Sequence, residues 1–273
     1  MTNKLYKLMN WPAIEEVIYS EASDPHAILG PHVSGTGTLI QTFVPGAERV
    51  QIQFLEDMSE KDMEMADEDG FFAIWLPKKK IGAYQYIITY PDGNTETRQD
   101  AYRHKSLFTR ADEEAFSYGI HYNVYEKLGA HPMTLDGEDG VYFAVWAPNA
   151  VRVSAVGDFN EWDGRIHQMK KLDSGVFEIF VPGAKVGDNY KFELKLKTGL
   201  TYLKADPYGN AAQLRPETAS VITDLKGFAW EDEDWIDNRK NVQNPKAPIS
   251  VYELYLGSFA APKKGEELSL IHI

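Results

Sequence analysis

A tryptophan set among short polar side chains marks residues 157–164, whose sequence is GDFNEWDG. The Trp162 indole offers a flat apolar face, and Asn160 and the carboxylates beside it offer hydrogen-bonding groups. This combination suits a sugar, whose C–H groups pack on an aromatic ring while its hydroxyls bind the polar neighbours. The alternative is a core tryptophan beside a turn, with Asn160 holding the turn. The octapeptide by itself does not separate the two interpretations.

Two expected strands lead into this loop. Residues 141–146 alternate side chains with the period of two that a half-buried strand shows. Pro148 and Asn149 break the run, and residues 151–156 resume the alternation up to Gly157. The loop is therefore expected at the end of a strand, where its side chains are held by a sheet.

The chain repeats itself at a spacing of about 100 residues. Residues 43–50 (FVPGAERV) correspond to residues 146–153 (WAPNAVRV), 103 positions later. Upstream, LGPH at 29–32 resembles LGAH at 128–131. A spacing that stays near 100 predicts two copies of one domain rather than a short-repeat solenoid.

Each copy is expected to be an antiparallel sandwich of the immunoglobulin-like type, so the fold class is all-β. The predicted strands are 38–44, 49–55, 71–76 and 84–90 in the first copy and 141–146, 151–156, 176–181 and 189–197 in the second. Two helices are expected outside the sheets. One covers residues 11–20 with Asn10 as its N-cap, and the other covers residues 111–128 and bridges the sandwiches.

Composition narrows the class of partner. With 41 Asp and Glu against 28 Lys and Arg, the formal net charge of -13 repels nucleic acid and anionic lipid but is indifferent to a neutral polysaccharide. The 273 residues contain no cysteine and no apolar run long enough to span a membrane. We expect a soluble, cytoplasmic protein with no nucleic-acid or membrane partner.

The character of the chain changes after residue 221. A charged, proline-containing connector runs to about residue 248, and ISVYELYLGSF at 249–259 resembles a buried strand. Nothing that follows in the sequence supplies a partner for that strand. We therefore expect it to be the first strand of a further domain.

Three landmarks, taken in order, point to one family. They are GDFNEWDG at 157–164, KADPYGNAAQLRPETASVI at 204–222 and ISVYELYLGSF at 249–259. With the sandwich in front of them, they resemble the N-terminal part of bacterial 1,4-α-glucan (glycogen) branching enzymes. The resemblance implies an N-terminal sandwich at 1–110, a family 48 carbohydrate-binding module at 111–228, a linker at 229–248 and the start of a truncated (β/α)₈ barrel at 249–273.

The chemistry implied by this family is a retaining transfer of α-1,4-glucan to a 6-hydroxyl, using one carboxylate as nucleophile and a second as acid. In the family those carboxylates lie on later barrel strands. We therefore assign no catalytic residue and expect the chain by itself to be inactive. LSLIHI at 268–273 does not resemble the polar loop expected there, which suggests a truncated or chimeric gene.

The resemblance places glucan contacts in the second copy. Trp162 is the leading candidate, because Ser59 occupies the corresponding place in the first copy and the fold therefore does not require a tryptophan. Lys191, in a YKF pattern, resembles the lysine that family 48 modules use for sugar hydroxyls; otherwise it is an outward-facing strand residue. Tyr202 is the nearest aromatic before the DP dipeptide, in a shifted register, and Asn160 is the fourth candidate.

Other polar groups are given structural interpretations. Asp158, Glu161 and Asp163 are so close in one loop that solvated turn residues are favoured over a glycosidase pair. His32 and His131 occupy equivalent places in the two copies, which favours a structural role over metal binding. We expect no metal and no cofactor.

Two other classes of function stay open. A debranching or trehalose-forming glycoside hydrolase carries a similar module but usually lacks the first sandwich. A non-enzymatic glycogen-binding module has no enzyme attached, and the strand expected at 249–259 argues against it. The partner expected in all cases is α-glucan, such as glycogen or amylose, and for the branching enzyme also its catalytic barrel.

Overall fold

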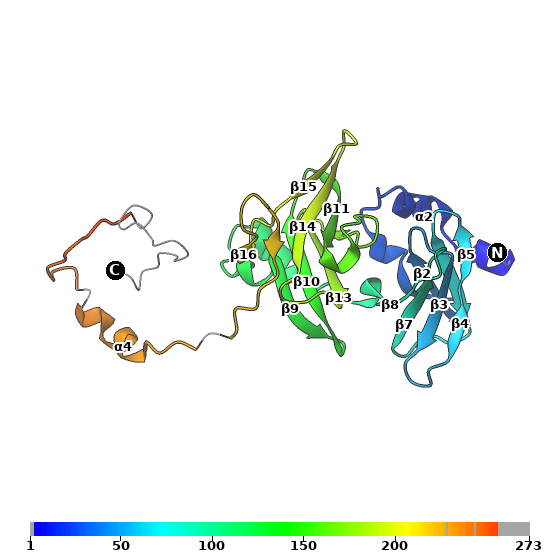
Figure 1. The fold of residues 1–273 in the computed structure, drawn as a ribbon, viewed down its shortest axis with the longest axis horizontal. Helices are drawn as coiled ribbons and strands as arrows, with labels where there is room; N and C mark the ends of the chain where they lie inside the picture. Colours follow the sequence, from blue (N-terminus) through cyan, green and yellow to red (C-terminus); the bar gives the residue numbers. More distant parts are fainter. Residues whose placement is uncertain (1–2, 228, 243, 256–273) are drawn as a thin grey trace. The chain divides into compact units, whose positions relative to one another are not determined.

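The computed structural model describes residues 3–227, 229–242 and 244–255. The chain divides into two units, residues 1–225 and 226–273. The first unit contains both sandwiches, shown from blue to yellow in Figure 1.

The first sandwich consists of two four-stranded antiparallel sheets that face each other, with strand orders β1-β2-β6-β5 and β4-β3-β7-β8. Its strands are β1 (Gly30–Ser34), β2 (Gly37–Phe43), β3 (Arg49–Phe54), β4 (Glu60–Asp62), β5 (Glu64–Asp67), β6 (Phe71–Leu76), β7 (Tyr84–Thr89) and β8 (Thr95–Gln99). The buried faces of β2, β3, β6 and β7 form the core between these sheets.

The second sandwich repeats this plan. Its sheets have the orders β12-β13-β10-β9 and β11-β14-β17-β16, with β15 paired to β14. Its strands are β9 (Gly129–Leu135), β10 (Glu138–Trp146), β11 (Ala150–Gly157), β12 (Lys170–Lys171), β13 (Val176–Pro182), β14 (Asn189–Leu196), β15 (Thr201–Lys204), β16 (Ala211–Ala212) and β17 (Ser220–Val221). The prediction of an all-β fold with two copies of one immunoglobulin-like domain is confirmed.

The eight predicted strands all form, with ends within three residues of those expected. They were visible because each buries at least one face, so apolar side chains recur along it; β2 and β13, which lie under helices or neighbouring strands, are buried on both faces. The edge strands β1, β4, β5 and β9 were not predicted. A strand at a sheet edge can expose side chains on both faces. Strand β4 does so, since all three of its residues are exposed.

Helices cover the outer face of one sheet in each sandwich. In the first sandwich these are α1 (Asn3–Leu8) and α2 (Trp11–Ile18), followed by a 3₁₀ turn, η1 (Pro25–Ala27). In the second they are α3 (Arg110–Ser117) and a 3₁₀ turn, η3 (Val124–Glu126). Helices α2 and α3 have eight residues each and start 99 positions apart. The starts of η1 and η3, and of β1 and β9, are separated by the same 99 positions. The helix is therefore part of the repeat.

The prediction of one bridging helix over 111–128 is wrong, because α3 ends at Ser117. Thr109 caps it by accepting from the Asp112 amide, while the Asp112 carboxylate accepts from the Thr109 amide. Gly119 follows with a φ of 69°, a left-handed conformation that ends helices. Asn10 precedes α2 as expected but makes no side-chain capping hydrogen bond.

The two sandwiches share a joint built on a third 3₁₀ turn, η2 (Ala101–Arg103). The Tyr102 hydroxyl donates to the Ile166 carbonyl (2.9 Å) and accepts from the Gln168 amide (3.0 Å). The Gln168 side-chain amide then donates to the Val17 carbonyl at the end of α2 (2.9 Å). Ala101 and Tyr102 thus pack with the core of the second sandwich.

The second unit contains helix α4 (Glu233–Val242) within the connector expected at 229–248. The strand expected at 249–259 is wrong as far as the structure describes it: residues 249–255 form no strand, and residues 256–259 lie outside the described residues. Ile249 and Val251 are exposed there. The physical reason is that a strand needs a hydrogen-bonded neighbour, and within the described ranges this segment has none.

Candidate functional site

The loop after β11 is folded by the amide of Asn160. Its Oδ1 accepts from the Gly157 backbone amide (2.9 Å), and its Nδ2 donates to the Ala155 carbonyl (2.9 Å) and to Nδ1 of His167 (3.0 Å). Asn160 is buried. These hydrogen bonds join the loop to the end of β11 and to His167, so the Asn160 side chain holds the turn.

Trp162 is held over the start of β14. Its backbone has a φ of 63°, its ring is half-buried, and its indole N–H donates to Oδ1 of Asp158 (3.2 Å). Oδ2 of the same Asp158 accepts from the backbone amide and from Nδ2 of Asn189, both at 2.8 Å. Gly157 permits this close approach, because a Cβ there would lie 2.3 Å from the Asn189 carbonyl oxygen.

Lys191 lies two residues beyond Asn189 on β14 and therefore on the same face of the sheet. Its Nζ donates to the Thr218 hydroxyl (2.7 Å), which comes from the loop before β17. Hydrogen bonds thus link Trp162, through Asp158, and Thr218, through Lys191, to the first residues of β14. Thr218 was missed by the sequence reasoning, since it lies 27 residues from Lys191 and carries no motif.

Tyr202 is not part of this linked group. On β15 it pairs directly with Leu194 of β14, and directly paired residues share one face of a sheet. Leu194 packs against the core of the sandwich and alternates with Lys191 and Asn189, so Tyr202 projects from the opposite face to theirs. Its ring is exposed, with Nζ of Lys204 5.7 Å from its centroid.

The first copy lacks a corresponding site. Where the second copy has the Trp162 loop, the first has β4 paired with β3. Ser59 lies just before β4, and its hydroxyl and amide both donate to Asp57. The loop that carries Trp162 is therefore confined to one of the two related domains.

Asp163 is held by hydrogen bonds from Arg165, which follows the loop. Burial raises the pKa of Asp163, but hydrogen bonds from the Arg165 guanidinium and backbone amide outweigh it and leave the pKa below its usual value. Such a carboxylate is suited to stay ionised, not to donate a proton. This environment differs from that of a glycosidase acid.

Three buried carboxylates elsewhere have raised pKa values because burial disfavours their charge: Asp100, Glu178 and Asp206. Each is hydrogen-bonded by a buried tyrosine hydroxyl. Asp100 accepts from Tyr84 (2.6 Å), and Asp206 accepts from Tyr190 (2.6 Å).

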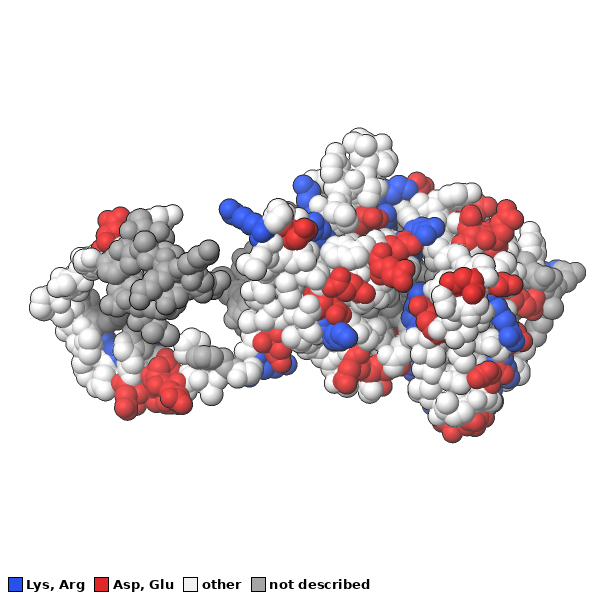
Figure 2. All heavy atoms as spheres, viewed as in Figure 1, with Lys and Arg blue, Asp and Glu red and all other residues white. Residues whose placement is uncertain are grey.

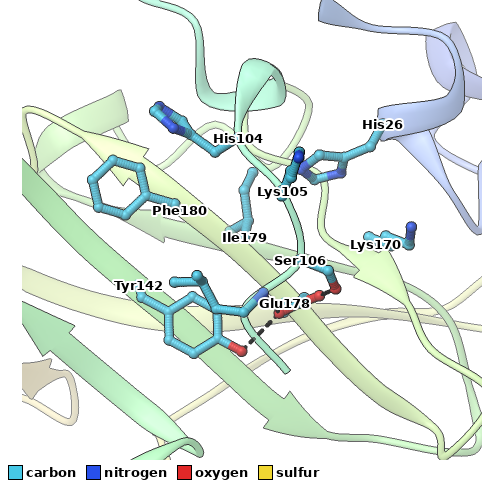
Figure 3. Close-up of a pocket in the computed structure, with 10 residues that line it drawn as sticks. His26, His104, Lys105, Ser106, Tyr142, Lys170, Glu178, Ile179 and Phe180 are labelled. Atoms are coloured by element: carbon cyan, nitrogen blue, oxygen red, sulfur yellow. Dashed lines mark hydrogen bonds between the residues drawn. The ribbon is translucent and has the colours of Figure 1, made fainter. Parts of the chain in front are cut away.

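A cavity of about 240 Å³ lies at the joint between the sandwiches, shown in Figure 3. His26 of η1 and Lys170 of β12 border it, and the Glu178 carboxylate accepts hydrogen bonds from Ser106 and Tyr142 at its wall. Burial lowers the pKa of His26 to about 4, so the ring is neutral at pH 7. The cavity lies away from Trp162 and Lys191, neither of which lines it.

The equivalent histidines make the same contact. Nε2 of His32 lies 2.9 Å from the Leu29 carbonyl oxygen, and Nε2 of His131 lies 3.0 Å from that of Leu128. Among the described residues, no three or more metal-binding side chains are gathered. In the same part of the chain, no helix combines the length and apolarity needed to cross a bilayer.

The visible face of the molecule carries acidic atoms over both sandwiches, with basic atoms scattered between them (Figure 2). A neutral ligand fits such a surface better than a polyanion.

Each of the two sandwiches matches a known protein family model. Residues 10–102 match the family model described as alpha-1,4-glucan branching enzyme GlgB, N-terminal domain. Residues 127–209 match carbohydrate-binding module 48 (isoamylase N-terminal domain). Over these two matches the chain is similar to the N-terminal third of proteins named 1,4-alpha-glucan branching enzyme.

Relatives named 1,4-alpha-glucan branching enzyme GlgB match most of the chain. The protein from Thermosynechococcus vestitus is 42% identical over 90% of this chain and 33% of its own length. That from Synechocystis is 40% identical over 97% of this chain and 35% of its own length, and that from Rubrobacter xylanophilus is 40% identical over 94% and 35%. The chain thus spans about a third of the curated relatives it matches. The Trp162 loop lies in the region matched by the family 48 module.

Proposed function

We propose that the chain binds α-glucan through its family 48 module and acts joined to the catalytic region of a 1,4-α-glucan branching enzyme. That enzyme cuts an α-1,4-glucan and transfers the cut chain to a 6-hydroxyl. Glycogen and amylose are the glucans proposed. The match of the first sandwich to the branching-enzyme N-terminal model supports this function over a debranching or trehalose-forming hydrolase.

The observation that supports the proposed glucan site is the hydrogen-bond link from Trp162, through Asp158, to the strand that carries Lys191. Asp158 links the indole N–H to Asn189, two residues before Lys191. A ring fixed in this way loses little freedom on binding, so it is a preorganised platform for a sugar. Lys191 and Thr218 supply donors beside it. In this arrangement Asn160 acts through the loop and does not touch the sugar.

Affinity electrophoresis in glycogen-containing gels tests the site. Trp162→Ala removes a stacking face worth on the order of 1 kcal/mol or more, so retardation by glycogen should fall close to the detection limit. Trp146→Ala is the matched control, because Trp146 is an exposed tryptophan of the same sandwich on the other sheet. Unchanged retardation of a folded Trp162→Ala variant would show that Trp162 is a packing residue.

Variants of Lys191 and Tyr202 test which face of the sheet binds the glucan. Lys191→Ala should weaken binding less than Trp162→Ala, because a solvent-facing hydrogen bond contributes about 0.5–1.5 kcal/mol. Tyr202→Ala should leave retardation unchanged, since Tyr202 projects from the opposite face. The same gels run with added salt should give nearly constant affinity, because a neutral glucan releases no counterions. Loss of binding in Tyr202→Ala alone would move the site to the β15 hairpin.

We also propose a cytoplasmic location. It rests on the absence of cysteine from the sequence, which suits a reducing compartment. Fractionation of the source cells with an antibody against the chain tests it, and recovery in a secreted fraction would contradict it.

A further inference from the structure

A short segment joins the Trp162 loop to the first sandwich. It consists of residues 165–169, directly after the loop, and we call it the bridging segment. On one edge the segment runs beside β11, where the Ala155 amide donates to the His167 carbonyl (3.1 Å). In Figure 1, β11 lies on the side of the second sandwich that faces α2. The bridging segment is therefore placed between its own sheet and the first sandwich.

On its other edge, a side chain of the first sandwich takes the place of a neighbouring strand. The Tyr102 hydroxyl donates to the Ile166 carbonyl (2.9 Å) and accepts from the Gln168 amide (3.0 Å). In an extended segment a carbonyl and the amide two residues later point to the same edge, so one hydroxyl can bind both. Burial raises the pKa of Tyr102, which keeps its hydroxyl protonated as the donation requires. The Gln168 side chain adds a hydrogen bond to the Val17 carbonyl of α2 (2.9 Å).

The residue between these two contacts supports the Trp162 loop. Nδ1 of His167 accepts from the Asn160 amide (3.0 Å), and its ring packs against that of Phe159, with the ring centroids 5.8 Å apart. His167 is only 5% exposed, so its ring has little room to move by itself. A shift of the main chain at 166–168 would therefore displace the acceptor on which the turn of Asn160 relies, and with it the indole of Trp162.

The loop thus has supports from both sandwiches. From the second, Arg152 donates to the Gly164 carbonyl (3.1 Å), and Asp158 links the Trp162 indole to β14. From the first, the Tyr102 hydroxyl holds the bridging segment. The geometry ties the conformation of a loop in one domain to a side chain of the other.

We propose that Tyr102 is a positioning residue for glucan binding. Through its hydroxyl the first sandwich fixes the bridging segment, and the segment sets the Trp162 loop of the second sandwich in its binding conformation. The proposal rests on the proposed function, because it takes Trp162 as the platform for the sugar. Tyr102 acts without touching the glucan. The first sandwich, which has no loop of this kind, contributes to glucan affinity through its neighbour.

Tyr102→Phe tests the proposal, because it keeps the ring and removes only the hydroxyl. Glycogen affinity of the whole chain is measured by affinity electrophoresis at a temperature where every variant is folded. The affinity should fall about threefold to tenfold, the effect of losing one buried hydrogen bond. Tyr142→Phe is the matched control and should bind normally. It also deletes a buried tyrosine hydroxyl, but one that donates to Glu178 on the other sheet of the second sandwich.

Hydrogen exchange read by mass spectrometry separates positioning from general destabilisation. The amides of residues 157–164 should exchange about tenfold faster in Tyr102→Phe, because the loop opens more often, while those of β13 keep their rate. Tyr142→Phe should leave the exchange of residues 157–164 unchanged. Gln168→Met removes the side-chain hydrogen bond to Val17 but keeps the main chain, and it should act in the same direction. If Tyr102→Phe does not fold, Gln168→Met supplies the same comparisons.

Unchanged exchange of residues 157–164 in Tyr102→Phe overturns the proposal. So does faster exchange throughout the chain, which would make Tyr102 a residue of general stability. Loss of retardation in Trp162→Ala but not in Tyr102→Phe overturns the role of Tyr102 and leaves the glucan site intact. Full retardation of both variants overturns the glucan site, and the role of Tyr102 with it.

Discussion

At the residue scale, the two sandwiches share a buried tyrosine–aspartate pair that closes each domain. Tyr84 and Tyr86 both donate to Asp100, while Asp206 receives one tyrosine hydroxyl, from Tyr190. Burial, together with the neighbouring carboxylates, raises the pKa of all three tyrosines, so they stay protonated donors. The second copy therefore relies on a single hydroxyl where the first has two.

This difference predicts unequal effects of removing one hydroxyl. Tyr190→Phe should lower the free energy of unfolding by about 1–3 kcal/mol, because a buried carboxylate loses a donor. Tyr86→Phe should cost less, since Tyr84 still donates to Asp100. Urea denaturation of both variants makes the comparison, with Tyr202→Phe as an exposed control. Equal losses in the two would show that Asp100 does not share its donors in this way.

At the element scale, the Trp162 loop depends on a neutral histidine. Nδ1 of His167 accepts from the Asn160 amide, and burial, with a smaller contribution from the Arg98 charge, lowers the pKa of His167 to about 3. A proton on Nδ1 would remove this acceptor, so protonation opposes the folded loop. The loop that presents the tryptophan is thus tied to the protonation of a residue outside the GDFNEWDG motif.

The resulting pH dependence has a definite sign. Between about pH 3 and 6.5 the unfolded chain binds a proton at His167 that the folded chain does not, so stability falls as pH falls through this window. From pH 6.5 to pH 5 this one group should contribute about 2 kcal/mol of loss, at about 1.4 kcal/mol per pH unit. His167→Gln, which keeps a hydrogen-bond acceptor, should reduce the slope of unfolding free energy against pH in urea titrations. An unchanged slope would assign the acid sensitivity to other groups, of which His26 is the first candidate.

At the scale of the whole molecule, the first 225 residues form one unit in which residues of the first sandwich pack against the core of the second. Ala101 lies in the core of the second sandwich, and Tyr102 packs against that core. The boundary proposed after residue 110 therefore leaves a contact that both domains share. We propose the division into a first sandwich at 1–110 and a second at 111–228 from the repeat of their elements.

Limited proteolysis should reveal this organisation. The first cuts are expected in the acidic connector at 231–247, where α4 has no buried residue. Removal of the residues after Leu225 should leave the unfolding temperature of the rest unchanged and improve solubility, because Ile249, Val251 and Tyr252 are exposed apolar residues. A shortened chain that aggregates more than the full one would contradict this expectation.

The sequence by itself determined the duplication, the eight main strands and the loop that carries Trp162. These features are local or periodic: a half-buried strand repeats every two residues, and a glycine-rich break ends it. At the place that corresponds to Trp162 the first copy has Ser59, in a differently folded segment that leads into β4. Such comparisons need no knowledge of distant contacts.

Only the tertiary structure decided which side chains meet. The pairing of Tyr202 with Leu194 sets it on the far face, and a shift of one residue in that register would have reversed the result. Lys191 meets Thr218 because a loop 27 residues away in the sequence folds beside it. Asn160 holds its turn partly through a hydrogen bond to His167, which lies outside the motif. The segment at 249–255 forms no strand, because strand pairing depends on neighbours that periodicity does not reveal.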